Sequence, residues 1–190
     1  MGTGKTTLTN KLILALEDKG YHVIYKKFAS TLYDMQTEIY RLADIPLEGD
    51  KDRELLQWLG TEWGRKKDKD IWVNAWESSI KFINRNKNDK TIIITDDMRF
   101  LNEEKKVKEL GGYTIKIDGP QRGDNISSTE HVSELDIDKM SPYYIFHNGR
   151  DEIEMDLNIM HSLLPSIETF FTIKELGTHD GMSITRGAKL

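Results

Sequence analysis

Hydrophobic side chains in the first half of the chain mostly follow helical spacing. The stretch from Lys5 to Leu16 has apolar residues three and four positions apart, and Gly20 suits the left-handed residue that ends many helices. The β-rich run from His22 to Tyr25 predicts a short strand. Helical spacing, interrupted at Pro46 and Gly49, then predicts further helices over about 31–43, 52–65 and 70–86.

Strand-like and helical patterns alternate in the second half. The run TIIIT at 91–95 is typical of a strand buried on both faces, and it ends at Asp96 and Asp97. Residues 177–190 are polar and predict a loose tail. Between these ends, the predicted elements are a helix over 103–110, strands over 113–117 and 143–146, a polar loop over 118–130, and a helix over about 151–171 that Pro165 breaks or kinks. The alternation predicts an α/β domain with a mainly parallel sheet and crossover helices.

Composition limits the classes of protein that fit. A chain of 190 residues, 37% of them hydrophobic, predicts one compact domain with a modest appendage. No apolar run is long enough for a membrane span or a secretory signal. The absence of cysteine excludes disulfides, thiolate zinc sites and cysteine nucleophiles, and it fits a reducing cytoplasm. A net charge of −5 disfavours a broad nucleic-acid-binding surface but leaves room for a local basic pocket that takes small anions.

The N-terminus carries most of a phosphate-binding loop. In the full pattern G-x-x-x-x-G-K-S/T, backbone N–H groups surround the phosphates, the lysine reaches the outer pair and the hydroxyl holds Mg²⁺. Gly4, Lys5 and Thr6 match its second half, whereas the first glycine and the strand that normally precedes the loop would fall upstream of Met1. The alternative is a glycine-rich start that caps a helix; the motifs downstream favour the phosphate loop.

A second constellation follows the TIIIT strand. Asp96 and Asp97 can orient a magnesium-bound water or a substrate hydroxyl, and Arg99 can grip a phosphate bidentately. The alternative is a charged strand cap. Two acids and an arginine directly after a doubly buried strand favour a functional role.

Four cations lie on separate predicted elements that the topology brings to one edge of the sheet. They are Lys27, Arg53, Arg65 and Arg122. Phosphoryl transfer uses positioned cations because its transition state spreads charge over several oxygens. Each cation alone is a common surface charge. Arg122 lies in the long polar loop, which predicts a lid that closes over the transferred group.

A hydrolase is a weaker alternative. His131, Ser133 and Glu134 contain the residue types of a Ser-His-acid site, but Ser133 lacks the G-x-S-x-G context. The five histidines show no H-E-x-x-H or comparable spacing, so no structural metal site is predicted.

Six segments together resemble the phage-type deoxynucleoside monophosphate kinases, within the P-loop nucleoside monophosphate kinase group. The resemblance covers nearly all of residues 2–170, and its most specific parts are LQWLGTEWGR and DMRFLNE. The segments are GTGKTTL from Gly2, KKFAS from Lys26, RELLQWLGTEWGR from Arg53, DDMRFLNE from Asp96, HVSE from His131 and HNG from His147. The resemblance implies transfer of the ATP γ-phosphoryl group to a deoxynucleoside monophosphate, with Mg²⁺ as cofactor.

The resemblance also implies roles for individual residues. It assigns ATP binding to Gly2, Gly4, Lys5, Thr6, Thr7 and Asn148, the last of these near the adenine. It assigns the acceptor to Lys27, Phe28, Arg53, Gln57, Arg65, Asp97 and Arg99, with Phe28 stacked on the base and Arg99 on the phosphate. The implied catalytic residues are Lys5, Arg99 and Arg122, and the implied magnesium ligands are Thr6 and Asp97.

The implied fold is a three-layer α/β/α P-loop NTPase without its first, central strand, which predicts a gap between the strands at 91–95 and 113–117. The kinase domain would span 1–171, with a lid at about 118–138 and acceptor-binding helices at about 31–86, and 172–190 would be a tail. The expected partners are ATP and a deoxynucleoside monophosphate in the cytoplasm, or the host cytoplasm if a phage encodes the chain. No stable nucleic-acid partner and no membrane are expected, and a homodimer is left open. Three alternatives stay open: a kinase of another small molecule, an inactive nucleotide-binding module and a DNA-associated ATPase.

Overall fold

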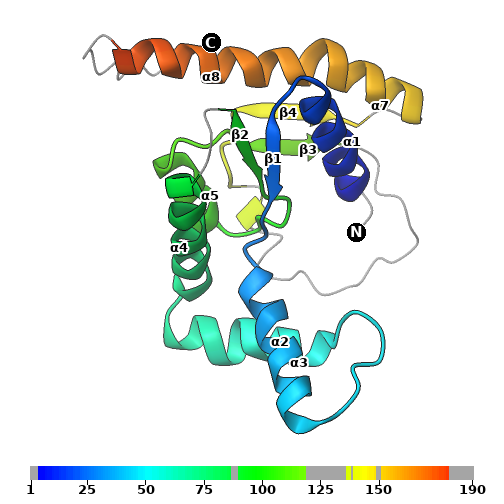
Figure 1. Cartoon of the computed structure of the whole chain (residues 1–190), viewed down its shortest axis with the longest axis vertical. Coiled ribbons are helices and arrows are strands. Elements are labelled where there is room, and N and C mark those ends of the chain that lie inside the picture. Colours follow the sequence, from blue (N-terminus) through cyan, green and yellow to red (C-terminus); the bar gives the residue numbers. More distant parts are fainter. Residues whose placement is uncertain (1–3, 87–89, 119–135, 138, 149–150, 180–190) are drawn as a thin grey trace. The chain divides into compact units, whose positions relative to one another are not determined.

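The computed structural model describes residues 4–86, 90–118, 136–137, 139–148 and 151–179. They form a mixed α/β structure with short parallel sheets (Figure 1). They divide into two compact units, each described by itself. The terminal unit holds the described residues up to Ala15, from Tyr113 to Asp118, and from Pro142 onward. The central unit holds Leu16–Gly112 and the described residues between 136 and 141.

The elements follow one another along the chain as helices and strands, with two π-helical segments labelled η. The order is α1 (Lys5–Asp18), β1 (His22–Tyr25), α2 (Ser30–Ala43), α3 (Arg53–Gln57), η1 (Trp58–Arg65), α4 (Ile71–Asn86), β2 (Thr91–Ile94), α5 (Leu101–Glu109), β3 (Ile115–Asp118), β4 (Tyr144–His147), α7 (Glu152–Asn158), η2 (Ile159–Leu163) and α8 (Leu164–His179).

The sheet of the central unit consists of β1 and β2, which run parallel. Tyr25 pairs with Ile94 at the last position, so both strands end at the same edge. Beyond this edge the Lys26 N–H donates to the Ile94 carbonyl at 2.9 Å, and the Thr95 hydroxyl donates to the Lys26 carbonyl at 2.7 Å. The chain segments that leave the two strands therefore start side by side.

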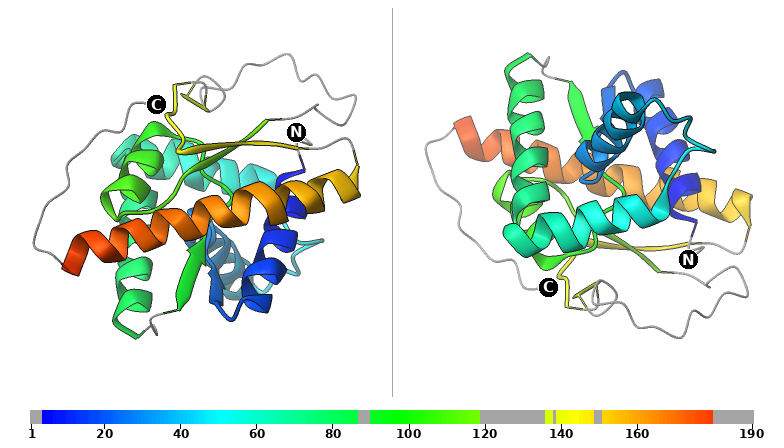
Figure 2. Two further views of the ribbon diagram at one scale, coloured as in Figure 1. Left: turned by 90° about the horizontal axis from the view of Figure 1, so that it is seen from above. Right: turned by 90° about the horizontal axis from the view of Figure 1, so that it is seen from below.

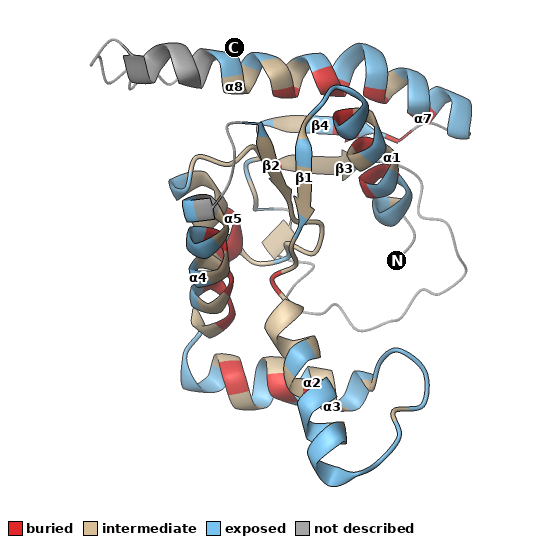
Figure 3. Cartoon of the chain, in the orientation of Figure 1, coloured by how far each residue is buried: buried red, intermediate tan, exposed pale blue. Residues whose placement is uncertain are grey.

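The core of the central unit forms around α4. Its buried residues are Trp72, Val73, Trp76 and Ile80, which recur at helical spacing, and Figure 3 colours the buried segments of the helix red. Phe28, which follows β1, packs into this core with its ring centroid 4.4 Å from that of Trp76. The cluster consists of Phe28, Val73, Trp76 and Ile80, with Ile83, Ile93, Met98 and Val107 packed against it.

A π-helix replaces the second half of the single helix predicted over 52–65. The change accommodates Trp72, whose indole N–H donates to the Gly60 carbonyl at 2.8 Å. The same ring lies against Gly64, where an added Cβ would be 2.3 Å from Cζ2 of Trp72. The local sequence therefore needs glycine at this position, and a wider helical turn lets η1 close onto α4.

The terminal unit has its own parallel sheet, β3 and β4, packed with α1 and the C-terminal helices. Lys11 on α1 pairs with Asp156 on α7 at 2.7 Å. Figure 2 shows α7, η2 and α8 as one long rod. The buried apolar residues of this unit are Leu8, Leu12, Phe146, Met155, Ile159, Leu163, Leu164 and Ile167.

The structure confirms every predicted strand and the parallel direction of each pair, and it changes three details. First, β2 and β3 belong to separate two-stranded sheets in the described residues, where one mainly parallel sheet was predicted. Second, the last helix continues to His179, beyond its predicted end near Phe171. Third, α7, η2 and α8 follow one another without a break, and the irregular turn lies in η2, just before Pro165, the second residue of α8.

None of the described helices combines the length and the apolar character that a bilayer span requires.

Candidate active site

The first site region is the start of α1, in the terminal unit. Gly4 has a φ of +77°, in the left-handed region, and its carbonyl accepts from the Leu8 N–H at 2.9 Å. Lys5, Thr6 and Thr7 form the exposed first turn. Backbone N–H groups at such a terminus, together with a lysine and hydroxyls, are well suited to bind phosphate oxygens.

Gly4 lies against Asn148, which follows β4. A Cβ at Gly4 would be 2.6 Å from the Asn148 Nδ2 atom, and the left-handed backbone would strain any other L residue, so glycine suits this position. Asn148 is buried, and its backbone N–H donates to the Asp118 carbonyl at 2.7 Å. The structure thus brings together two residues, far apart in the sequence, to which the family resemblance assigned ATP binding.

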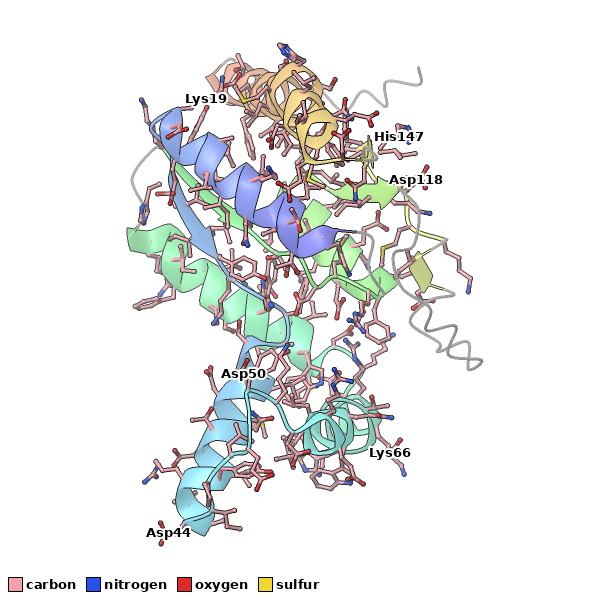
Figure 4. All side chains as sticks on the ribbon, turned by 90° about the vertical axis from the view of Figure 1, so that its right-hand side faces the viewer. Lys19, Asp44, Asp50, Lys66, Asp118 and His147 are labelled. Carbon is pink, nitrogen blue, oxygen red and sulfur yellow. The ribbon has the colours of Figure 1, made fainter. Side chains whose placement is uncertain are left out.

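Asp118 and His147 end the two strands beside this position. The His147 Nδ1 atom lies 3.3 Å from the Asp118 carboxylate, and both side chains are exposed (Figure 4). The pair joins the carboxyl ends of β3 and β4. Sequence reasoning assigned no role to either residue.

In the central unit, Asp97 holds the loop that follows β1. Its two carboxylate oxygens accept from the backbone N–H groups of Phe28 and Ala29, each at 2.9 Å. Burial raises the pKa of the Asp97 carboxyl, and the two hydrogen bonds act against that shift. Asp97 therefore fixes the segment that carries the predicted acceptor residues Lys27 and Phe28.

Asp96, the neighbouring acid, points to a different partner. It accepts from the Tyr25 hydroxyl at 2.6 Å, and the Lys27 ammonium lies 5.3 Å from the centre of the Tyr25 ring. Burial, followed by the bond to Asp96, raises the pKa of Tyr25, and contact with Tyr25 raises that of Lys27. The sequence singled out Asp96 as able to orient a magnesium-bound water or a substrate hydroxyl, but it did not predict the contact with Tyr25. The matched ends of the two parallel strands are the signal that could have paired the two residues.

Arg99 and Arg65 have different environments although both were assigned to the acceptor. The Arg99 side chain is exposed and makes no ion pair with any described residue. The Arg65 guanidinium pairs with the Glu103 carboxylate at 2.6 Å and lies 3.7 Å from the Phe100 ring centre. Sequence reasoning missed Glu103; its position in the first turn of a helix, three residues after Phe100, is the signal that could have found it.

One known protein shows the family of the chain. It comes from Acanthamoeba polyphaga mimivirus, is provisionally named a deoxynucleotide monophosphate kinase, and is 31% identical over 175 residues. The match covers 80% of this chain and 86% of the viral protein. The chain belongs to the deoxynucleotide monophosphate kinase family. No family model matches it.

Three further residues that were predicted to bind the acceptor differ in how exposed their side chains are. Phe28 is 3% exposed and its ring packs on Trp76, so in this conformation it is not presented to a base. Arg53 and Gln57 are exposed at the two ends of α3, one helical turn apart. Asp52 caps that helix by accepting from the Leu55 N–H at 2.9 Å.

Some predicted features of the kinase lie outside the described residues. These are Gly2, Arg122, the hydrolase-like group at 131–134 and most of the lid at 118–138. Of the predicted magnesium ligands, Thr6 belongs to the terminal unit and Asp97 to the central unit. Over the described part of the chain, no three acidic, histidine or cysteine side chains gather into a metal site.

Proposed function

We propose that the chain transfers the γ-phosphoryl group of ATP to a deoxynucleoside monophosphate, giving ADP and the deoxynucleoside diphosphate. Membership of the deoxynucleotide monophosphate kinase family supports the reaction class. The observation that carries the proposal is the start of α1, where a left-handed Gly4 leads into an exposed Lys5 and Thr6. The α/β elements with parallel strands are compatible with a three-layer P-loop NTPase, which we propose as the complete fold.

In this proposal, α1 binds the donor. Backbone N–H groups of its first turn and the Lys5 ammonium stabilise the outer phosphates of ATP. Asn148, packed on Gly4, lies at the adenine side. As the bond between the γ-phosphorus and its bridging oxygen breaks, negative charge moves onto ADP, and Lys5 is the cation that offsets it.

The acceptor binds to the central unit in this proposal. The exposed Arg99 guanidinium pairs with the monophosphate, one oxygen of which forms the new bond to the γ-phosphorus. Arg53 and Gln57 are available for the nucleoside because both are exposed. Phe28 is buried, so it shapes the loop after β1 and reaches the base only if that loop changes conformation.

Magnesium fits the chemistry of these residues. Mg²⁺ usually keeps several waters and binds nucleotide phosphates with only one or two protein oxygens, so a cluster of acidic residues is not required. The Thr6 hydroxyl, exposed in the first turn of α1, is the donor that we propose to hold it. When bound, the ion would neutralise charge on the phosphates. The Asp97 oxygens already accept two backbone N–H groups, so we propose a supporting role for this residue.

A coupled ADP-release assay with Mg²⁺-ATP and a panel of deoxy- and ribonucleoside monophosphates tests the proposal. We expect turnover that depends on a deoxynucleoside monophosphate. Lys5→Ala should lower kcat by at least about a hundredfold, the scale found when one preorganised transition-state donor is removed. Lys11→Ala is the matched control, because Lys11 lies on the same helix and pairs with Asp156.

The other outcomes separate the alternatives. Turnover with a different acceptor would indicate a kinase of another small molecule, and stimulation by DNA would indicate a DNA-associated ATPase. ATP binding without turnover under any condition would refute transfer and indicate a binding module. Equal activity in Lys5→Ala and Lys11→Ala would refute the donor site.

A further inference from the structure

Glu103 is a buried carboxylate with three hydrogen-bond donors around it. Its Oε2 atom accepts from the backbone N–H of Arg99 at 2.7 Å and from that of Phe100 at 3.1 Å. Its Oε1 atom accepts from Nη2 of Arg65 at 2.6 Å. The residue is only 3% exposed, so these contacts replace the water that a carboxylate would otherwise bind. Glu103 thus joins the backbone of Arg99 to a guanidinium from η1.

The contacts of Arg65 occupy both its face and its edges. The guanidinium carbon lies 3.7 Å from the centre of the Phe100 ring, and Nη1 donates to the Lys69 carbonyl at 3.3 Å. With the pair to Glu103, two donor groups and one face are engaged within the protein. Its side chain is 18% exposed. This is the environment of a guanidinium that supports a loop, in contrast to one presented to a ligand.

A second attachment holds the start of α5, just after Arg99. The Asn102 amide donates to the Lys69 carbonyl at 3.0 Å and to the Asp70 carboxylate at 2.7 Å. The residues just after Arg99 are therefore fixed to the segment that follows η1. The Arg99 side chain itself is exposed. A fixed backbone with an exposed guanidinium is the arrangement that preorganised binding residues need.

We propose that Glu103 is the positioning residue of the acceptor site: it fixes the backbone of Arg99 and recruits Arg65, which acts through Glu103 and does not touch the acceptor. The proposal rests on the proposed function, because it takes Arg99 as the ligand of the acceptor phosphate. It removes Arg65 from the acceptor residues that the family resemblance implied.

The first test compares Glu103→Gln with Glu104→Gln. Glu104 is a matched control: it is 6% exposed in the same helical turn, and it accepts from the Ser141 N–H at 2.9 Å and pairs with Lys108 at 2.8 Å. Loss of a residue that orients a ligand-binding group typically costs 10- to 100-fold. We expect Glu103→Gln to raise the acceptor KM about tenfold or more with a smaller change in kcat, and Glu104→Gln to leave KM within about twofold. Equal KM values for the two variants would overturn the proposal.

Double-mutant cycles test whether Glu103 acts on the acceptor through Arg99, and whether Arg65 acts through Glu103. In an Arg99→Ala background, Glu103→Gln should change the calorimetric Kd of the acceptor by less than about twofold, since the group that it positions is gone. In a Glu103→Gln background, Arg65→Met should likewise change the Kd of the acceptor by less than about twofold. If Arg65→Met raises the Kd of the acceptor as much in that background as it does in the wild-type chain, Arg65 binds the acceptor directly and the proposal fails.

Amide hydrogen exchange tests the positioning without any turnover. In Glu103→Gln the Arg99 and Phe100 amides should exchange at least about tenfold faster, while the amides of β2 keep their wild-type rates. Unchanged exchange at Arg99 and Phe100 would overturn the proposal even if the variant loses activity. If the wild-type chain transfers phosphate to no acceptor, the proposed function fails, and this measurement still decides whether Glu103 fixes the loop. Arg65→Met serves the same purpose if Glu103→Gln does not fold.

Discussion

Replacement of Asp97 should destabilise the central unit far more than replacement of its neighbour Asp96. The Asp97 carboxylate is the acceptor for two backbone N–H groups, those of Phe28 and Ala29, both at 2.9 Å. A buried donor left without a partner costs about 1–3 kcal/mol. Asp97→Ala should therefore lower the free energy of unfolding by about 2–6 kcal/mol, a large part of the 5–15 kcal/mol typical of a whole domain.

Asp97→Asn gives a sharper comparison. The new side chain keeps one oxygen acceptor but presents an NH₂ group to the second backbone N–H, so we expect a loss of about 1–3 kcal/mol. In Asp96→Asn, the side chain can still accept from the Tyr25 hydroxyl, which lies at the surface. That variant should lose less than about 1 kcal/mol.

Urea denaturation followed by tryptophan fluorescence measures both variants, since the chain has four tryptophans. The midpoint of Asp97→Asn should fall clearly below that of Asp96→Asn, with similar slopes. Equal midpoints would mean that the Asp97 carboxylate does not hold the loop after β1, and the supporting role proposed for it would be wrong.

Three further predictions concern single positions. Gly64→Ala should lose about 1–3 kcal/mol by chemical denaturation, because the new methyl group would lie 2.3 Å from a ring atom of Trp72; unchanged stability would refute that close approach. Gly4→Ala should raise the KM for ATP at least severalfold, because an Ala Cβ would lie 2.6 Å from Asn148 and alanine is strained at a φ of +77°; an unchanged KM would separate this turn from ATP binding. Burial raises the pKa of Glu103 above its ordinary 4.5, because the folded state resists ionisation of this carboxyl. The part of the stability that depends on its protonation is fully present below pH 4.5 and is lost as pH rises through the folded-state pKa. The stability of the wild type relative to Glu103→Gln should therefore fall on going from pH 4.5 to 7, and a difference that grows over this range would contradict the direction of the shift.

Sequence patterns predicted the elements that depend on local spacing. The helix α4 and the strand β2 were both predicted, the first from apolar residues at helical spacing and the second from the continuous β-branched run TIIIT. That run predicted burial on both faces, whereas all four residues of β2 are only half-buried. The π-helical turn of η1 was not predicted. It results from the approach of Trp72 to Gly60 and Gly64, a contact between two segments that no local pattern records.

Sequence position alone did not give the direction of side chains in the candidate site. Phe28 follows a strand end, as residues that contact ligands often do, yet its ring packs on Trp76 in the core. A strand of only four residues gives too short an alternation to tell which face of the following loop is buried. The assignment of Phe28 to the acceptor base stays a prediction, and its burial means that the loop would have to open for it.

The two arginines of the predicted acceptor site show what decides a role in such a protein. Arg65 and Arg99 carry the same charge and both lie in the central unit, but they contact Glu103 in different ways. The buried Glu103 carboxylate accepts from the side chain of Arg65 and from the backbone N–H of Arg99. A guanidinium held by a buried acid is already neutralised and gains little from a phosphate. A guanidinium whose backbone is held gains more, because less freedom is lost on binding. The placement of a third residue, and not the arginine itself, therefore determines which cation is available to the acceptor.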